Sequence, residues 1–215
     1  MKTITNLLLA FVIFCSASTM LMAQQTEKEL KKDVASRAIR SARKEAKKYA
    51  RDGYYVAPGA PLLDKQLERA WMKQLETNDK NESKYITATG NSVGESQTAA
   101  KLQAMETAKL EMAGQISTQI AALIENSIAN QQLNNEEAAS VTKTVAASKN
   151  LIAQELGQVI PMVEMYKKIG KNVEANVRLA YNLATAFDVA KKVIRKSLEE
   201  ETKVAHEKLE KLMNF

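Results

Sequence analysis

NVEANVRLAYN, residues 172–182, alternates apolar and polar side chains with the two-residue period of a β-strand. The side chains expected on one face are those of Val173, Ala175, Val177, Leu179 and Tyr181. Those expected on the opposite face are Asn172, Glu174, Asn176 and Arg178. Because the first set is apolar and the second is polar, the stretch predicts a half-buried strand with one face toward a core and the other toward solvent.

The residues before this strand predict its partner. Residues 158–169 include Val163 and Met165, and Gly170-Lys171-Asn172 supplies a plausible hairpin turn into the strand at 172–182. Pro161 cannot donate a hydrogen bond to a neighbouring strand. We therefore expect this second strand to lie at a sheet edge or to contain a bulge.

A third strand is expected earlier in the chain, within SKYITATG, residues 83–90. Gly90 and Gly94 follow, and we expect them to turn the strand into a helix that Ser96 caps. The run Gly90-Asn91-Ser92-Val93-Gly94 lacks the lysine and hydroxyl pair of a phosphate-binding loop, so we reject that interpretation.

Apolar side chains spaced three or four residues apart predict the helices. The longest is expected over Gln97–Asn130, and residues 136–154 are expected to be mainly helical. One continuous helix is expected from Leu183 to about Met213. Its outer half, beyond Glu201, has a weaker apolar face and is expected to project from the core.

The N-terminal part reads as an appendage to this domain. Residues 25–51 have a narrow, alanine-rich helical stripe, and GYYVAPGAP, residues 53–61, breaks it before a short helix that carries Trp71. The fold class is therefore α+β: a small antiparallel sheet with an alanine-rich helix packed on one face, a helical N-terminal arm and a long C-terminal helix. The expected segments are a signal peptide (1–23), the arm (24–80), the α+β domain (81–182) and the C-terminal helix (183–215).

The first residues indicate export. Lys2 precedes the apolar run Leu7–Phe14, which has the length of a signal-peptide core and is too short to span a membrane. Ala23 supplies a small residue for signal peptidase, so we expect a mature chain that begins at Gln24. The alternative is cleavage before Cys15 with lipidation of that cysteine, against which the bulky Phe14 argues.

Cleavage after Ala23 would leave a mature chain without cysteine, since Cys15 is the only one, and such a chain suits an envelope compartment. We expect the protein in the periplasm or associated with the outer membrane, with lipid anchoring the less favoured alternative. His206 is the only histidine, which excludes a histidine pair for catalysis or metal binding. No catalytic motif is recognisable, so we expect neither enzymatic activity nor a cofactor or metal.

Two surface features are candidates for contacts. Ten lysines and arginines lie between Lys28 and Arg51, and this basic helix either contacts an anionic membrane surface or is a solvated face. The aromatic candidates for a ligand or partner contact are Trp71, Tyr85, Tyr166 and Tyr181. Trp71 at helical spacing is alternatively a packing anchor. The sequence has no platform of interleaved aromatic and basic residues, so we expect no nucleic-acid binding.

ATGNSVGESQTAAKLQAMETAKLEMAGQIS, residues 88–117, together with NVEANVRLAYN, resembles the Lpp-twenty lipoprotein family of bacterial envelopes. That family includes an outer-membrane lipoprotein antigen and a flagellar outer-membrane ring protein. The resemblance covers roughly residues 84–181 and implies a small α+β domain used for envelope assembly, with no catalytic residues. Only the poorly placed Cys15 matches the lipid-bearing cysteine of the family.

These features predict a non-catalytic, exported cell-envelope protein with a structural or protein-interaction role. Its expected partners are envelope proteins or further copies of itself. The alternative is a binding module for a small or polymeric envelope ligand, seated between the sheet and the helix that carries Trp71.

Overall fold

The sheet predicted from residues 172–182 is the centre of the molecule. The computed structural model describes residue 29 and residues 32–130, 133–202 and 204–214. The described strands are β1 (Tyr85–Gly94), β2 (Ile160–Ile169) and β3 (Asn172–Asn182). They form one antiparallel sheet in the order β1-β3-β2, so β3 is the central strand. The sheet and the helices around it confirm the α+β class.

β2 and β3 form the predicted hairpin. Gly170 has a φ of 59° in the turn, a backbone conformation that glycine adopts without steric cost. The register shifts between Pro161 and Val163, on a strand at the sheet edge, which confirms the prediction made from Pro161. Because of this shift, the adjacent side chains of Met162 and Val163 both join the same buried cluster.

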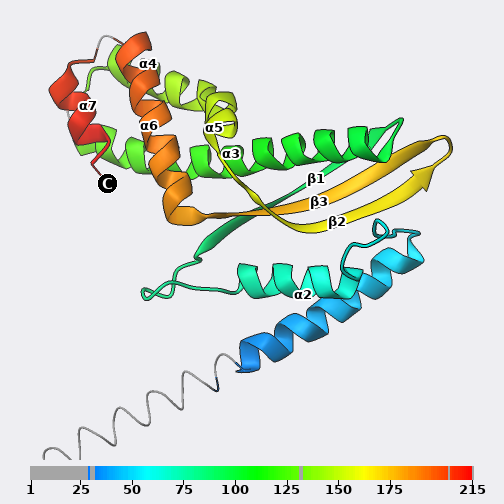
Figure 1. Ribbon diagram of the computed structural model, residues 1–215. Coiled ribbons are helices and arrows are strands. Elements are labelled where there is room, and N and C mark those ends of the chain that lie inside the picture. Colours follow the sequence, from blue (N-terminus) through cyan, green and yellow to red (C-terminus); the bar gives the residue numbers. More distant parts are fainter. Residues whose placement is uncertain (1–28, 30–31, 131–132, 203, 215) are drawn as a thin grey trace, which may run out of the picture.

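α3 (Gln97–Asn130) covers one face of the sheet and packs most closely on β1 (Figure 1). Ala100, Ala104 and Ala108 are fully buried there, and a Cβ atom on Gly90 would lie 1.9 Å from the backbone oxygen of Ala104. The expectation that Gly90 and Gly94 form a turn is therefore wrong, since both lie within β1. Their missing side chains let a helix backbone approach the strand, and the turn falls at the next two residues. The Oγ of Ser96 accepts a hydrogen bond from the backbone N–H of Ala99, so its predicted capping role is confirmed.

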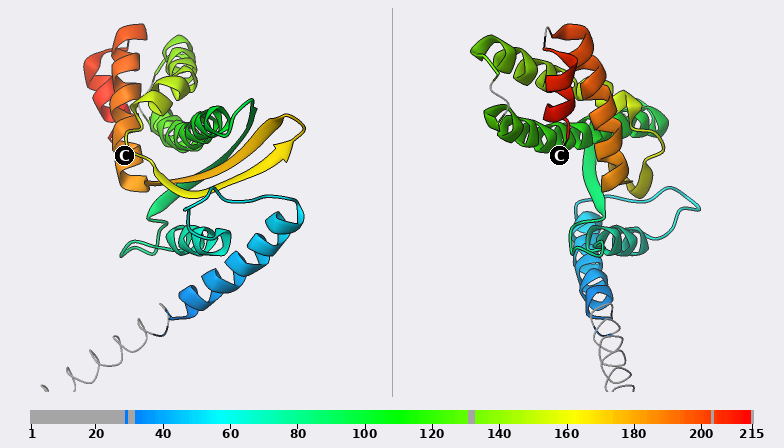
Figure 2. Two further views of the ribbon diagram at one scale, coloured as in Figure 1. Left: turned by 45° about the vertical axis from the view of Figure 1, so that its right-hand side comes forward. Right: turned by 90° about the vertical axis from the view of Figure 1, so that its left-hand side faces the viewer.

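The second face of the sheet is also covered. α2 (Leu63–Gln74) and the helix over residues 32–51, here called the N-terminal helix, lie on the side opposite α3 (Figures 1 and 2). The buried cluster between them and the sheet consists of Ala42, Leu67, Ala70, Met162, Val163, Met165 and Ala180.

The expectation that β3 is half-buried, with its polar face toward solvent, is thus wrong. Asn176 on that face is buried, and its amide donates a hydrogen bond to the side chain of Asn91 on β1. Ala180 is fully buried. Pairing of the polar groups makes burial of this face possible, because a buried amide without a partner would be costly.

The remaining helices gather at one end of α3, away from the hairpin (Figure 1). They are α4 (Asn135–Ala147), α5 (Lys149–Glu155), α6 (Leu183–Glu201) and α7 (His206–Leu212). α4 begins with a capping box, in which Asn134 and Glu137 exchange hydrogen bonds between side chain and backbone.

The expectation of a single C-terminal helix from Leu183 to about Met213 is wrong, because α6 ends at Glu201 and α7 begins at His206. The backbone of Thr202 is extended (φ −117°, ψ 155°), and α7 turns back toward the core. Val204, Leu209 and Leu212 are buried in the main core cluster, so the expectation of a projecting outer half is also wrong. Burial of these three apolar side chains favours the folded-back arrangement over a straight helix that would expose them.

Candidate functional site

Besides the apolar cluster, polar contacts of one acidic residue, Glu45, link the N-terminal helix to the sheet. Its Oε2 accepts a hydrogen bond from Trp71 Nε1 at 2.8 Å, and its Oε1 pairs with Arg178 Nη2 at 2.6 Å. Trp71 comes from α2 and Arg178 from the centre of β3. The carboxylate therefore joins three elements. Tyr49, one turn further along the helix, lies in the same contact, where burial first and the Glu45 charge second raise its pKa.

The opposite side of the N-terminal helix is basic and faces outward. Every described lysine and arginine of residues 32–51 is exposed: Lys32, Arg37, Arg40, Arg43, Lys44, Lys47, Lys48 and Arg51. We call this set the basic face. Within the helix, Asp33 pairs with Arg37 at 2.6 Å with both side chains largely in solvent, whereas Glu45 is directed inward. The outward charge of the helix is therefore strongly positive.

The tip of the β2–β3 hairpin lies near the C-terminal end of the N-terminal helix (Figures 1 and 2). Lys168 and Lys171 are exposed at this tip. Lys167 Nζ lies 5.7 Å from the ring centre of Tyr54. Burial and the neighbouring Glu174 raise the pKa of the Tyr54 hydroxyl to about 12, so Tyr54 is neutral at physiological pH.

The four aromatic candidates do not form one site. Trp71 belongs to the cluster between α2 and the sheet, where its ring is half-buried and its N–H is bonded to Glu45. These contacts fit the packing-anchor interpretation. Tyr85 lies on the same side of the sheet, and its hydroxyl accepts a hydrogen bond from Lys73 Nζ at 2.8 Å.

Tyr166 and Tyr181 belong to the cluster on the other side, under α3. Tyr166 is buried, and its backbone pairs with that of Tyr55. Because the sheet separates the two pairs of side chains, no single pocket can be lined by all four. The sequence did contain a signal that these tyrosines face opposite sides of the sheet. Successive side chains of a strand point to opposite faces, so the position of each tyrosine in the alternating pattern indicates its side.

An open hollow of about 750 Å³ lies elsewhere, between the loop that precedes β1 and the start of α6. It is lined by Thr77, Asn78, Asp79, Glu82, Ser83, Lys84, Gln119, Asn182, Leu183, Ala184 and Phe187. None of the four aromatic candidates lines it. Its loop carries side chains of both charges, which suits a polar ligand more than an apolar one.

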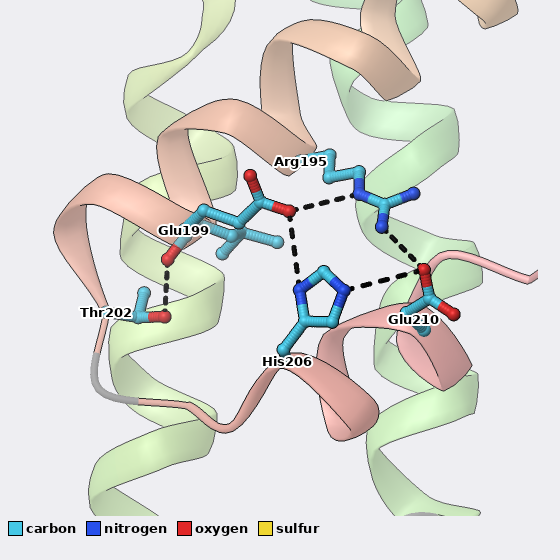
Figure 3. Close-up of polar contacts among 6 residues, drawn as sticks. Arg195, Glu199, Thr202, His206 and Glu210 are labelled. Atoms are coloured by element: carbon cyan, nitrogen blue, oxygen red, sulfur yellow. Dashed lines mark hydrogen bonds and ion pairs between the residues drawn. The ribbon is translucent and has the colours of Figure 1, made fainter.

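His206, the only histidine, is part of an exposed ion-pair cluster between α6 and α7 (Figure 3). Arg195 contacts Glu199 at 3.1 Å and Glu210 at 2.6 Å, and the two imidazole nitrogens of His206 lie 3.7 and 3.8 Å from these carboxylates. Hydrogen bonding to Arg195 lowers the pKa of Glu210. Arg195 thus lies between the carboxylates of Glu199 and Glu210, and its two ion pairs join α6 to α7.

Among the residues that the structure describes, no group of three or more histidine, cysteine, aspartate or glutamate side chains is arranged to hold a metal ion. Within the same residues, no helix combines the length and apolar character that crossing a bilayer requires. Cys15, Ala23 and Gln24 lie outside the described residues.

No protein-family model matches the sequence, and the comparisons with curated proteins and with solved structures found no match either. The resemblance to the Lpp-twenty family therefore rests on residues 84–181 of the sequence alone.

Proposed function

We propose that the protein is a non-catalytic, exported component of the bacterial cell envelope, and that its basic face contacts an anionic membrane surface peripherally. The observation that carries this proposal is the division of charge on the N-terminal helix. All its described basic side chains are exposed, while Glu45 is turned inward and paired. The N-terminal sequence, with its apolar run and Ala23, supports export.

The energy of such a contact comes from many weak attractions. Each lysine or arginine held near an anionic lipid surface contributes about 1 kcal/mol, and the attraction falls off within a Debye length of about 8 Å at physiological salt. The side chains of the basic face lie on one side of a single helix, so they can approach a flat surface together. Binding should therefore be strong at low salt and weak at high salt.

Co-sedimentation with lipid vesicles tests the proposal. The mature chain, beginning at Gln24, should sediment with vesicles of phosphatidylcholine and phosphatidylglycerol at about 2:1 and not with phosphatidylcholine alone. Raising the salt from about 0.1 M to about 0.5 M should release it. The variant with Arg40→Gln, Arg43→Gln, Lys44→Gln and Lys47→Gln should lose most of the binding.

A matched variant controls for net charge. Lys80→Gln, Lys143→Gln, Lys196→Gln and Lys211→Gln remove the same charge from exposed positions on other elements, and this variant should bind nearly as well as the unmodified chain. Equal losses in the two variants would show that net charge alone decides binding. Tighter binding to duplex DNA than to the anionic vesicles would also count against a membrane role.

The second candidate is a module for a small or polymeric envelope ligand. The hollow of about 750 Å³ favours this candidate. Its ligand would be polar and would bind in the hollow rather than beside Trp71, where the sequence had placed it. Titration of the isotope-labelled chain with soluble peptidoglycan fragments should then shift amide signals of residues 77–84 and of the start of α6. Shifts confined to the basic face, or none, would exclude this class of ligand.

A further inference from the structure

Among the residues that the structure describes, no strand pairs with the outer edge of β1. β1 pairs with β3 along all ten of its residues, and among the described backbone hydrogen bonds none leaves its other side. A strand edge of this kind presents a row of free N–H and C=O groups to which another strand can bond.

The edge formed by β2 is protected in several ways. Pro161 and the register shift beside it interrupt regular pairing near one end. Near the other end, the backbone of Tyr55 exchanges two hydrogen bonds of 2.8 Å with that of Tyr166. Lys167 and Lys168 follow directly. A further strand would meet interrupted backbone, an occupied segment and positive charge.

β1 has none of these protections. Tyr85–Gly94 contains no charged residue and no proline, and β1 pairs with β3 without a register shift. Thr89, Asn91 and Val93 are exposed on the side of the sheet away from α3. The contrast between the two edges indicates that β1 is kept available for pairing.

α3, which packs on β1, leaves space for a further strand beside the outer edge of β1. Gln103, Thr107 and Leu110 follow one another at helical spacing on α3, and all three are exposed. Gln103 accepts a hydrogen bond from Ser92 of β1, whereas Lys101 on the other flank of the helix reaches Glu164 of β2. The exposed stripe therefore overhangs the outer edge of β1, where it can cover one face of an added strand.

The charges at the two ends of β1 favour a second copy of the same strand. Lys73 and Lys84 gather at its beginning, where both bond to the single carboxylate of Glu76. Glu95 is exposed at its end. In an antiparallel pair of identical strands, Lys84 just before each β1 lies near Glu95 just after the other, and the uncharged strands between them bring no like charges together.

We propose that two copies of the chain associate through antiparallel pairing of their β1 strands. A two-fold axis perpendicular to the sheet would join two three-stranded sheets into one of six strands, with α3 of each copy on the same face. This inference specifies the self-association that the proposed function allows. Its test uses the chain in solution without a membrane, so either proposal can fail while the other stands.

Sedimentation equilibrium of the mature chain at concentrations up to about 1 mM should show a monomer–dimer equilibrium. Thr89→Lys together with Val93→Lys, two exposed positions near the middle and end of β1, should weaken the dimer about tenfold or more by placing like charges across the pair. The matched control is Ile169→Lys at the exposed end of β2, which should leave the dimer unchanged.

A charge-swap experiment makes the assignment specific. Thr89→Glu alone should weaken self-association as Thr89→Lys alone does, because Thr89 lies near its own counterpart at the centre of the pair, and an equimolar mixture of these two single variants should restore dimers as a mixed species. Circular dichroism checks that each variant is folded. A strict monomer over the whole concentration range, a dimer that the β1 lysines leave intact, or failure of the mixture to recover dimers would each overturn the proposal.

Discussion

Glu45 and Arg178 are joined by a 2.6 Å ion pair across the boundary between the N-terminal helix and the central strand. Their side chains are only 19% and 15% exposed, so the pair is partly shielded from water. The same carboxylate accepts the Trp71 N–H. This contact fixes which side of the helix faces the sheet, and therefore which side presents its basic residues.

Glu45→Ala should lower the free energy of unfolding by about 2–4 kcal/mol, because it leaves a poorly solvated guanidinium and an indole N–H without their acceptor. Urea unfolding followed by the fluorescence of Trp71, the single tryptophan, measures the loss at this site. Asp33→Ala, which removes the exposed partner of Arg37, should cost less than about 0.5 kcal/mol. Similar losses in the two variants would mean that the Glu45 contact has no special role.

Gly90→Ala should be severely destabilising. The added methyl carbon would lie 1.9 Å from the Ala104 backbone oxygen and 2.6 Å from the Ala108 nitrogen, and neither backbone atom can rotate away. We expect a loss of at least about 3 kcal/mol, or failure to fold, because α3 must move off the sheet.

Gly157→Ala is the control for that substitution. No atom lies within 4 Å of its added carbon, and its backbone does not have the positive φ that disfavours alanine. Its free energy of unfolding should change by less than about 1 kcal/mol. Thermal unfolding followed by circular dichroism compares the two variants, and a Gly90→Ala protein as stable as the control would contradict the close packing of α3 on β1.

The elements that sequence reasoning predicted correctly are those whose signals are local. Alternation in residues 172–182, the turn at Gly170 and the missing N–H of Pro161 each act within a few residues, and each is found as expected. The errors concern packing between distant segments. Nothing near Gly90 in the sequence shows that a helix backbone will lie against it.

Burial of the polar face of β3 was missed for the same reason. Arg178 and Asn176 are polar, and on an isolated strand they indicate solvent, but their partners are Glu45 and Asn91, far away in the chain. At the C-terminus, charged helical residues continue across Thr202 without glycine or proline, so the pattern contains no stop signal there. Exposure of the basic face could be predicted from the sequence, because lysine and arginine side chains are seldom buried.

The contact between Glu137 and Lys208 should depend on pH. Hydrogen bonding to Lys208 first, and to the backbone N–H of Asn134 second, lowers the pKa of Glu137 below its ordinary value of 4.5. A carboxyl with a lowered pKa in the folded protein stabilises the fold fully above its ordinary value. That contribution disappears as the pH falls through the lower, folded-state pKa.

Carboxyl carbon chemical shifts of Glu137, followed by NMR from about pH 7 to about pH 2, measure this pKa directly. Lys208→Met should raise it toward 4.5 while leaving the capping box of α4 in place. If the Glu137 pKa were the same with and without the lysine, the link from α4 to α7 would have no electrostatic part.

If the protein is exported as proposed, processing at the N-terminus decides how it would be held in the envelope. If signal peptidase cuts after Ala23, the purified protein should begin at Gln24, which is expected to cyclise, and osmotic shock should release it. Membrane contact would then depend on the basic face alone and should be reversible by salt. If a lipoprotein peptidase cuts before Cys15 instead, the chain would carry a diacylated cysteine and partition into detergent, since two acyl chains anchor a protein stably.

Intact mass of the envelope-purified protein distinguishes these outcomes, and two variants separate the steps. Cys15→Ser should leave the mass of the mature chain and its release unchanged, because the expected cut removes that residue. Ala23→Arg should instead block processing and leave a membrane-bound precursor, since signal peptidase requires a small residue at this position. A lipid-bearing species that retains the eight residues Ser16 to Ala23 would contradict the expected cleavage, and its loss in Cys15→Ser would identify the anchor.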